Sequence, residues 1–264
     1  MNLVRRTGTG WGGMLVIAEM TFRDAIRQRL FAGLLLFAGA FVFAAQALSD
    51  FNFGTTGARF ILDFGLAAQG LFGAMLVISL TLHLFLAELE QGDVRTLLAK
   101  PLARSSYLAG KWLGIAGLVG IFCIFTTALL AGVLLGAGEA GIPWIGLAFA
   151  GLAQWFKFLI LTSIVLLLSV ICRTVILAGL LSLVVLALCH LHAVMARPSE
   201  AGLSAFVLAA GAWLPDFQHF DLSERVGSGG IIGVWLMATL GAYALAYSAV
   251  LLTLAIHGFR KRDL

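Results

Sequence analysis

The chain has 264 residues, of which 61% are hydrophobic and only 11% are charged. Soluble globular domains carry about 25% charged residues, so this composition excludes an ordinary soluble enzyme or binding module. The formal net charge of +4 reflects basic residues in short polar segments between apolar runs, which indicates membrane orientation rather than nucleic-acid binding. We therefore expect an all-α polytopic membrane protein.

Apolar runs of about 20 residues recur along the chain, which is the length that crosses a bilayer core of about 30 Å. We predict six transmembrane helices in a single transmembrane domain that covers residues 1–264. The predicted spans lie near residues 30–48, 64–87, 112–137, 144–171, 175–195 and 229–257. No small-residue cleavage pattern clearly follows the first run, so we interpret it as a retained span.

Residues 1–29 are predicted to form an amphipathic elbow helix. Its apolar residues recur at three- and four-residue spacing, and charged residues fall largely between them. The apolar stripe consists of Leu15, Ala18, Phe22, Ile26 and Leu30. With arginines on its polar face, such a helix lies in the headgroup layer. It either only orients the first span or also contacts a cytoplasmic partner.

Orientation follows from the positions of lysine and arginine. All but four of the 17 basic residues lie in segments on one side of the predicted spans; the exceptions are Arg59, Arg197, Arg225 and Lys157. This bias predicts that both termini lie in the cytoplasm, in a bacterial-type inner (plasma) membrane. The outer loops are then residues 49–63 and 196–228.

The most strongly charged interior segment is residues 88–111, ELEQGDVRTLLAKPLARSSYLAGK. Asp93 is a good helix N-cap, and Leu97 and Leu98 continue an apolar stripe that Pro101 ends. We predict a short helix across the membrane surface, a turn, and a second helix that leads through Lys111 into the third span.

This segment resembles the cytoplasmic loop of ABC-2-type transporter permeases, with the pattern E-x-E-x-G-x-x-x-x-L-L-x-x-P-x-x-R-x-x-x-x-x-x-K. The matching residues are Glu88, Glu90, Gly92, Leu97, Leu98, Pro101, Arg104 and Lys111. Family members commonly have threonine after the glycine, where this chain has Asp93, and both residues cap helices. The elbow, the six spans and the long last outer loop extend the resemblance over the whole chain. Among these permeases, the chain is most similar to the branch involved in multi-copper enzyme maturation.

The resemblance implies a homo- or heterodimer of permease subunits, each bound on its cytoplasmic side by an ATP-binding cassette subunit. Residues 88–111, including Asp93, would then couple the spans to the partner, which holds ATP and Mg²⁺ and drives export. The chain lacks the G-x-x-x-x-G-K-[ST] phosphate loop, so we expect no catalytic residues, no cofactor in this chain, and ATP hydrolysis on the separate subunit.

The outer loop contains an apolar run at residues 201–214, which is too short to cross the bilayer. We expect a re-entrant segment that breaks at Pro215, with Phe217 and Phe220 at headgroup depth. It forms either a gate over the exit or a structural cap. Asp216, His219 and Asp221 are close in sequence but are ordinary residues for a wet loop, and we predict no metal site.

Lys157 lies near mid-depth of the predicted fourth span, where an unpaired cation costs roughly 2.5–3.5 kcal/mol. No carboxylate lies at a similar depth in the predicted spans. Lys157 is therefore expected to face a wet cavity, a partner subunit or carbonyl groups. It either lines a substrate path, with Gln154 and Gln69 as weaker candidates, or snorkels, makes a structural contact or reflects a shifted span boundary.

Two other classes of function are compatible with the sequence. A self-contained secondary transporter or channel is the main alternative, and an intramembrane enzyme would rest only on Ser79 and His83, an i,i+4 pair. Glycines such as Gly110 and Gly114, entering the third span, predict close helix packing. We expect contacts with membrane lipid and none with nucleic acid. The transported substrate is not specified by the sequence.

Overall fold

The computed structural model describes residues 10–49, 57–88, 104–137, 144–172, 174–191, 214–230 and 232–260. These residues form eight α-helices and no strand. The helices are α1 (Gly10–Arg27), α2 (Arg29–Ser49), α3 (Gly57–Thr81), α6 (Arg104–Gly136), α7 (Trp144–Ile171), α8 (Val175–His190), α12 (Ser223–Gly227) and α13 (Val234–Arg260). A π-helical turn, η2 (Leu82–Ala87), continues α3, and a 3₁₀ turn, η3 (Phe217–Phe220), precedes α12.

Five of the described helices are long and apolar enough to cross a membrane: α2, α3 with η2, α6, α7 and α13. They correspond to five of the six predicted spans. The predicted fifth span corresponds to α8, which has 16 residues and is shorter than a typical spanning helix. Residues 192–195, the predicted end of that span, lie outside the described residues.

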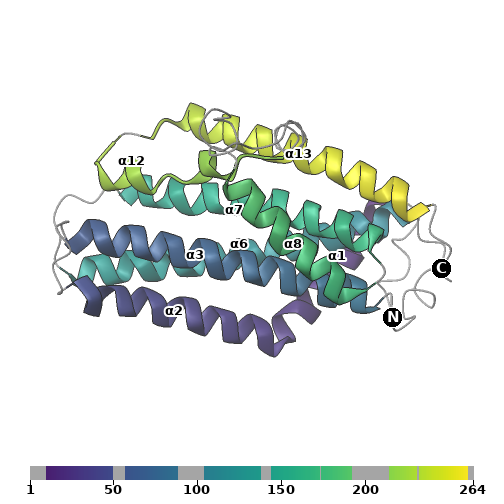
Figure 1. Cartoon of the computed structure of the whole chain (residues 1–264), viewed down its shortest axis with the longest axis horizontal. Coiled ribbons are helices and arrows are strands. Elements are labelled where there is room, and N and C mark those ends of the chain that lie inside the picture. Colours follow the sequence, from purple (N-terminus) through teal and green to yellow (C-terminus); the bar gives the residue numbers. More distant parts are fainter. Residues whose placement is uncertain are drawn as a thin grey trace, which may run out of the picture.

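The long helices form a bundle around α7. Of the five candidate spans, α7 has the largest fraction of buried residues. Figure 1 shows α13 and α2 on opposite sides of the bundle, with α3, α6 and α7 between them. α7 contacts α3, α6, α8 and α13, whereas α2 packs mainly on α3. Large apolar side chains on α2 and α8 remain exposed, including Leu36 and Ile176. Such surfaces suit lipid or another apolar partner.

α1 lies along the first half of α6 at very short range. A Cβ atom at Gly114 would lie 2.7 Å from the carbonyl oxygen of Ala18 and 2.7 Å from the Cβ of Thr21. At Gly110, a Cβ would lie 2.8 Å from the Cβ of Ile17. Only glycine permits this approach, which confirms close helix packing at these two positions.

The face that α1 buries differs from the predicted apolar stripe. Ile17, Thr21 and Ala25 are buried, whereas Leu15 and Ile26 from the stripe are exposed. α1 thus has one face on α6 and a second apolar face that no described residue covers. The second face is the one expected to contact lipid, so the surface-helix role of the elbow stays a prediction.

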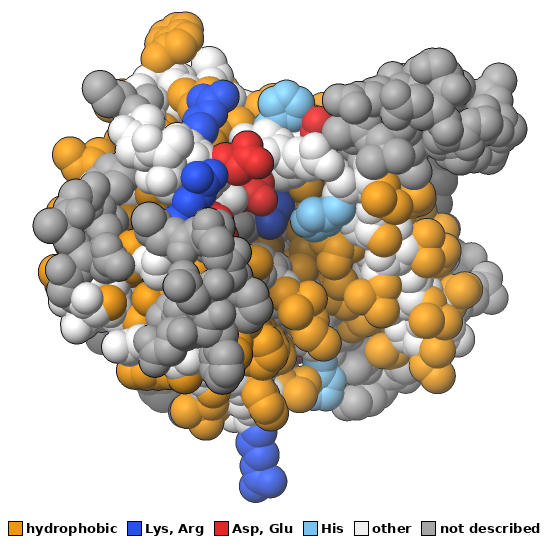
Figure 2. Space-filling view, turned by 60° about the vertical axis from the view of Figure 1, so that its left-hand side comes forward, with side chains coloured by type: hydrophobic (Ala, Val, Ile, Leu, Met, Phe, Trp, Pro, Cys, Tyr) orange, Lys and Arg blue, Asp and Glu red, His pale blue; other side chains and the backbone are white. Residues whose placement is uncertain are grey.

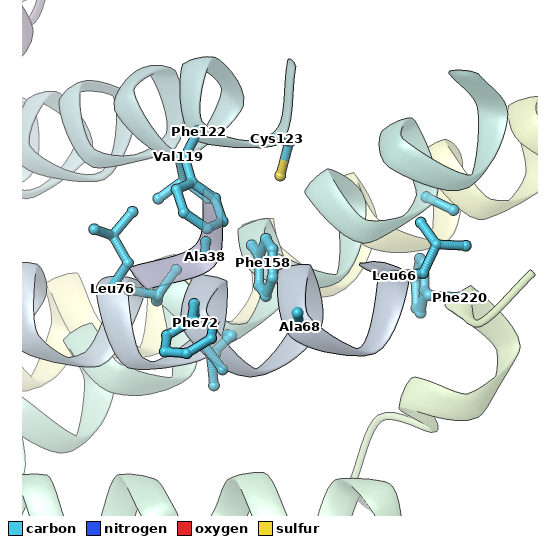
Figure 3. Close-up of a cluster of buried hydrophobic side chains, with 14 of the residues drawn as sticks. Ala38, Leu66, Ala68, Phe72, Leu76, Val119, Phe122, Cys123, Phe158 and Phe220 are labelled. Carbon is cyan, nitrogen blue, oxygen red and sulfur yellow. The ribbon is translucent and has the colours of Figure 1, made fainter. Parts of the chain in front are cut away.

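The core combines aromatic and aliphatic side chains from most of the long helices. In Figure 3, Phe122 of α6, Phe158 of α7 and Phe72 of α3 lie in one cluster. Phe220 also joins the core, near Leu66 of α3. Phe217 and Phe220 are buried, so these two rings anchor the segment around η3 to the bundle. Their expected position at headgroup depth stays a prediction. The predicted re-entrant run at 201–214 lies outside the described residues, apart from Leu214.

We predict opposite effects of the same substitution at two glycines of α6. Gly114→Ala should destabilise the protein by about 1–3 kcal/mol, because α1 must move away from the new methyl group. Gly132→Ala should be neutral or slightly stabilising, since nothing lies within 4 Å of a Cβ there and alanine is the better helix former. Thermal unfolding in one detergent measures both, and equal shifts would contradict the packing described here.

Candidate functional site

The two ends of the charged loop are joined by an ion pair between a buried lysine and a partly exposed carboxylate. The Nζ atom of Lys111 lies 2.7 Å from both carboxylate oxygens of Glu88 and donates a hydrogen bond of 2.7 Å to the carbonyl oxygen of Leu84. The hydroxyl of Tyr107 donates to the same carboxylate at 3.1 Å. The Lys111 side chain is 5% exposed and that of Glu88 is 24% exposed. Together these contacts hold the end of η2 against the start of α6.

The start of α6 is also held to the end of α13. Nη1 of Arg104 donates to the carbonyl oxygens of Phe259 and Arg260, at 3.3 Å and 3.1 Å. These carbonyls are among the last of the helix, where a cation offsets both the unpaired acceptors and the helix dipole. The rings of Phe85, Tyr107 and Phe259 pack beside these bonds. Three helix ends therefore meet where the loop leaves and re-enters the bundle.

The remaining predicted coupling residues are Glu90, Gly92, Asp93, Leu97, Leu98 and Pro101, and they lie outside the described residues. The surface helix that they are expected to form stays a prediction. The second predicted helix agrees with α6, which begins at Arg104 and runs without a break through Lys111.

Lys157 lies deep between α7 and α3. A Cβ atom at Gly70 of α3 would lie 3.5 Å from Nζ of Lys157 and 3.7 Å from the amide of Gln154. Lys157 is 5% exposed, and its ammonium forms no hydrogen bond or ion pair with the residues that the structure describes. It lies over the ring of Phe158, 5.4 Å from the centroid. The Oε1 atom of Gln154 is also buried without a hydrogen-bond partner.

Lys157 and Gln154 line a cavity of ≈ 500 Å³ between α3, α7, α8 and the segment before α12. Asp63, Asp221 and His190 line the same cavity. In Figure 2, acidic, basic and histidine side chains gather on this face beside a hollow with hydrophobic walls. The sequence placed no carboxylate at the depth of Lys157 in the predicted spans. The structure adds two carboxylates to the lining of its cavity, because α3 begins at Gly57 and includes Asp63, and because Asp221 lies beside α3 and α7.

Gln69, the third candidate, faces another helix. Its Nε2 donates to the carbonyl oxygen of Cys123 at 3.3 Å and to Oγ1 of Thr127 at 3.2 Å. Gln69 therefore joins α3 to α6, and it is not among the residues that line the cavity with Lys157.

The polar residues near η3 are engaged with one another and with the backbone. Asp216 pairs with His219 at 2.9 Å and accepts a bond from the backbone nitrogen of Gln218 at 2.9 Å. Asp221 accepts a bond from the backbone nitrogen of Ser223 at 3.1 Å. Within the described part of the chain, no three metal-ligating side chains gather.

Comparison with protein families identifies the class of this bundle. The family model described as "ABC-2 family transporter protein" matches residues 15–198, which is more than half of the chain. The chain belongs to the ABC-2 family of transporters. No curated protein matches the chain. The ABC-2 match includes the charged loop and Lys157 and ends before Asp221 and α13. As an ABC-2 transporter protein it is a multi-pass membrane component, and membership implies an ATP-binding partner subunit.

We predict that the Glu88–Lys111 pair of this ABC-2 protein behaves as one unit. Glu88→Gln should destabilise the protein, because it leaves the buried Lys111 ammonium with a neutral partner. The loss should fall below the roughly 3–5 kcal/mol found for fully buried pairs, since Glu88 is partly exposed. Glu88→Gln combined with Lys111→Met should recover part of the loss, because no uncompensated charge remains.

A double-mutant cycle on thermal unfolding measures this coupling. Additive effects of the two substitutions would show that the ion pair does not hold the ends of the loop together.

Proposed function

We propose that the chain is the permease subunit of an ATP-binding cassette exporter, driven by ATP hydrolysis on a separate subunit. ABC-2 family membership is the observation that carries this proposal. ABC-2 permeases typically lack the ATPase domain, and the chain contains no phosphate-loop motif. ATP and Mg²⁺ are accordingly assigned to the partner.

The charged loop is the proposed contact with that partner. In this proposal, Leu97 and Leu98 would form an apolar stripe that fits a groove on the ATP-binding subunit. Arg104 and Lys111 link the loop to the bundle. Because Lys111 contacts Glu88 and Arg104 contacts the end of α13, a force on the loop acts on three helices at once. This arrangement supports coupling between the partner's motion and the spans.

The proposed orientation places the loop, and both termini, in the cytoplasm. The basic residues support this orientation. The cavity that holds Lys157 lies toward the N-terminal end of α3, away from the loop, and it would then lie in the outer half of the membrane. Two permease chains, identical or different, complete the proposed exporter.

ABC-2 membership makes a self-contained carrier or channel the weaker alternative. The resemblance to the branch involved in multi-copper enzyme maturation remains a proposal about ancestry, and it names no substrate.

We predict that Leu97→Asp releases the ATP-binding subunit while membrane insertion stays normal. A carboxylate in the apolar stripe would be buried without a partner in the contact. Thr96→Asp is the matched control, since it adds the same charge to a neighbouring residue outside the stripe. The measurement is the amount of ATP-binding subunit that copurifies with each tagged variant, together with vanadate-sensitive ATP hydrolysis.

The proposed coupling role of the loop requires Leu97→Asp to lose most of the partner and Thr96→Asp to keep it. Full retention of partner and transport by Leu97→Asp would overturn that role.

A further inference from the structure

The cavity beside Lys157 has the properties of a ligand site. We propose that it binds a zwitterionic amphiphile, with the anionic group at Lys157 and the ammonium group toward Asp63 and Asp221. This inference deepens the proposed function and rests on it, since it assigns a class of compound to the membrane part of the exporter.

The deep end of the cavity requires an acceptor. Lys157 is only 5% exposed, and the described residues provide neither a hydrogen bond nor an ion pair for its ammonium group. Gly70 leaves open the space against which Nζ lies. A buried cation without a partner is costly in a membrane protein and marks a functional site. A phosphate or carboxylate at this point supplies the missing partner.

The end of the cavity at Asp63 and Asp221 requires a hydrogen-bond donor. Oδ1 of Asp63 is buried without a hydrogen-bond partner, and Asp221 lines the same cavity. Arg59 is the strongest charged neighbour of Asp63, and Asp221 and Glu224 add negative charge there. A simple anion would be repelled by these carboxylates, and a simple cation would be repelled by Lys157. A zwitterion matches both ends.

The separation of the charges fits a headgroup. Asp63 and Gly70 are seven residues apart on α3, which corresponds to about 10 Å along the helix axis. Because the side chains reach into the cavity from both ends, the two ligand charges would lie several ångströms apart. Phosphate and ammonium have such a separation in an ethanolamine phospholipid headgroup.

The walls indicate that the ligand also has an apolar part. Leu66 and Leu71 of α3 line the cavity together with Leu183 and Leu186 of α8. Leu71 and Leu183 are about half exposed, at 56% and 50%, so the cavity opens sideways on the surface of the bundle between these helices. In a membrane this surface adjoins lipid, and an acyl chain can extend from the cavity into the bilayer.

The test measures binding of dihexanoyl phosphatidylethanolamine to the intact permease–ATPase complex in mild detergent, by native mass spectrometry and titration calorimetry. Dihexanoyl phosphatidylglycerol, which lacks the amine, is the first comparator. Free phosphoethanolamine, which lacks the acyl chains, is the second. We expect one phosphatidylethanolamine per permease chain, with each comparator binding at least tenfold more weakly.

Two substitutions test the deep end of the cavity. Lys157→Met should weaken phosphatidylethanolamine binding at least tenfold while thermal stability stays the same or rises, because the substitution removes an unpaired buried charge. Gly70→Leu should block binding by filling the space near Nζ. Gly70→Ala is its control, since a Cβ there makes only ordinary contacts and should leave binding within about twofold.

One substitution tests the acidic end. Asp63→Asn should reduce the preference for phosphatidylethanolamine over phosphatidylglycerol, because it removes the charge that attracts the amine.

Unchanged binding in Lys157→Met, or equal binding of both lipids to the unmodified complex, would overturn the proposed site. If phosphoethanolamine binds as tightly as the lipid, the proposal that the ligand is an amphiphile is wrong. The cavity would then be a site for a soluble zwitterion. A lower melting temperature for Lys157→Met with unchanged binding would mark the lysine as a structural contact. If the complex retains its ATPase but binds none of the three probes, the site fails and the proposed function stands. If no ATP-binding subunit copurifies, the proposed function fails instead.

Discussion

A buried ammonium group requires an acceptor, and the two buried lysines of this bundle meet that requirement in different ways. Lys111 has the carboxylate of Glu88 and the carbonyl of Leu84 within 2.7 Å. Among the residues that the structure describes, Lys157 lies over the face of Phe158 and shares its cavity with two carboxylates, but it has no hydrogen bond or ion pair. The first lysine fixes the ends of the charged loop, and the second remains available to a ligand. Burial of a charged ammonium group is costly at both positions. At Lys111 the ion pair offsets this cost and joins two helix ends, whereas at Lys157 the unpaired charge marks a candidate ligand site.

α3 connects these two places. Its N-terminal half carries Asp63 and Gly70 beside the cavity, and its continuation through η2 leads to Glu88 at the loop. The π-helical turn lies directly before Glu88, and such turns interrupt the regular α-helix and are frequent at functional sites. A displacement of the loop that moves the Glu88–Lys111 pair therefore acts on the helix that forms one wall of the cavity. α7, the most buried long helix, provides the opposite wall through Gln154 and Lys157.

Much of the architecture follows from the pattern of apolar runs. The predicted fourth span, 144–171, has the bounds of α7, because a mainly apolar stretch begins after Pro143 and ends before Arg173. The predicted fifth span agrees with α8 up to His190, where the described helix ends. Its last residues, 192–195, lie outside the part of the chain that the structure describes. The loop motif and the helix through Lys111 were also visible in the sequence. The signal for the Glu88–Lys111 pair was present as well, because the two residues flank a loop between neighbouring helices.

The cavity could not be predicted in the same way. Asp63 was placed just outside the predicted second span, and Asp221 belongs to a segment more than 60 residues from Lys157 in the chain. Periodicity describes which face of a helix is apolar, but it does not describe which helices meet. For the same reason Gln69 and Gln154 looked equivalent, although one bonds to α6 and the other lies beside Lys157.

The central claim is that an external ATPase drives this membrane subunit. Purification of the tagged protein from its native membrane in mild detergent tests it most directly, with mass spectrometry and an ATPase assay on the eluate. The account predicts a stoichiometric ATP-binding subunit and vanadate-sensitive hydrolysis. Reproducible absence of that subunit, with this chain alone forming a stable oligomer, would contradict it.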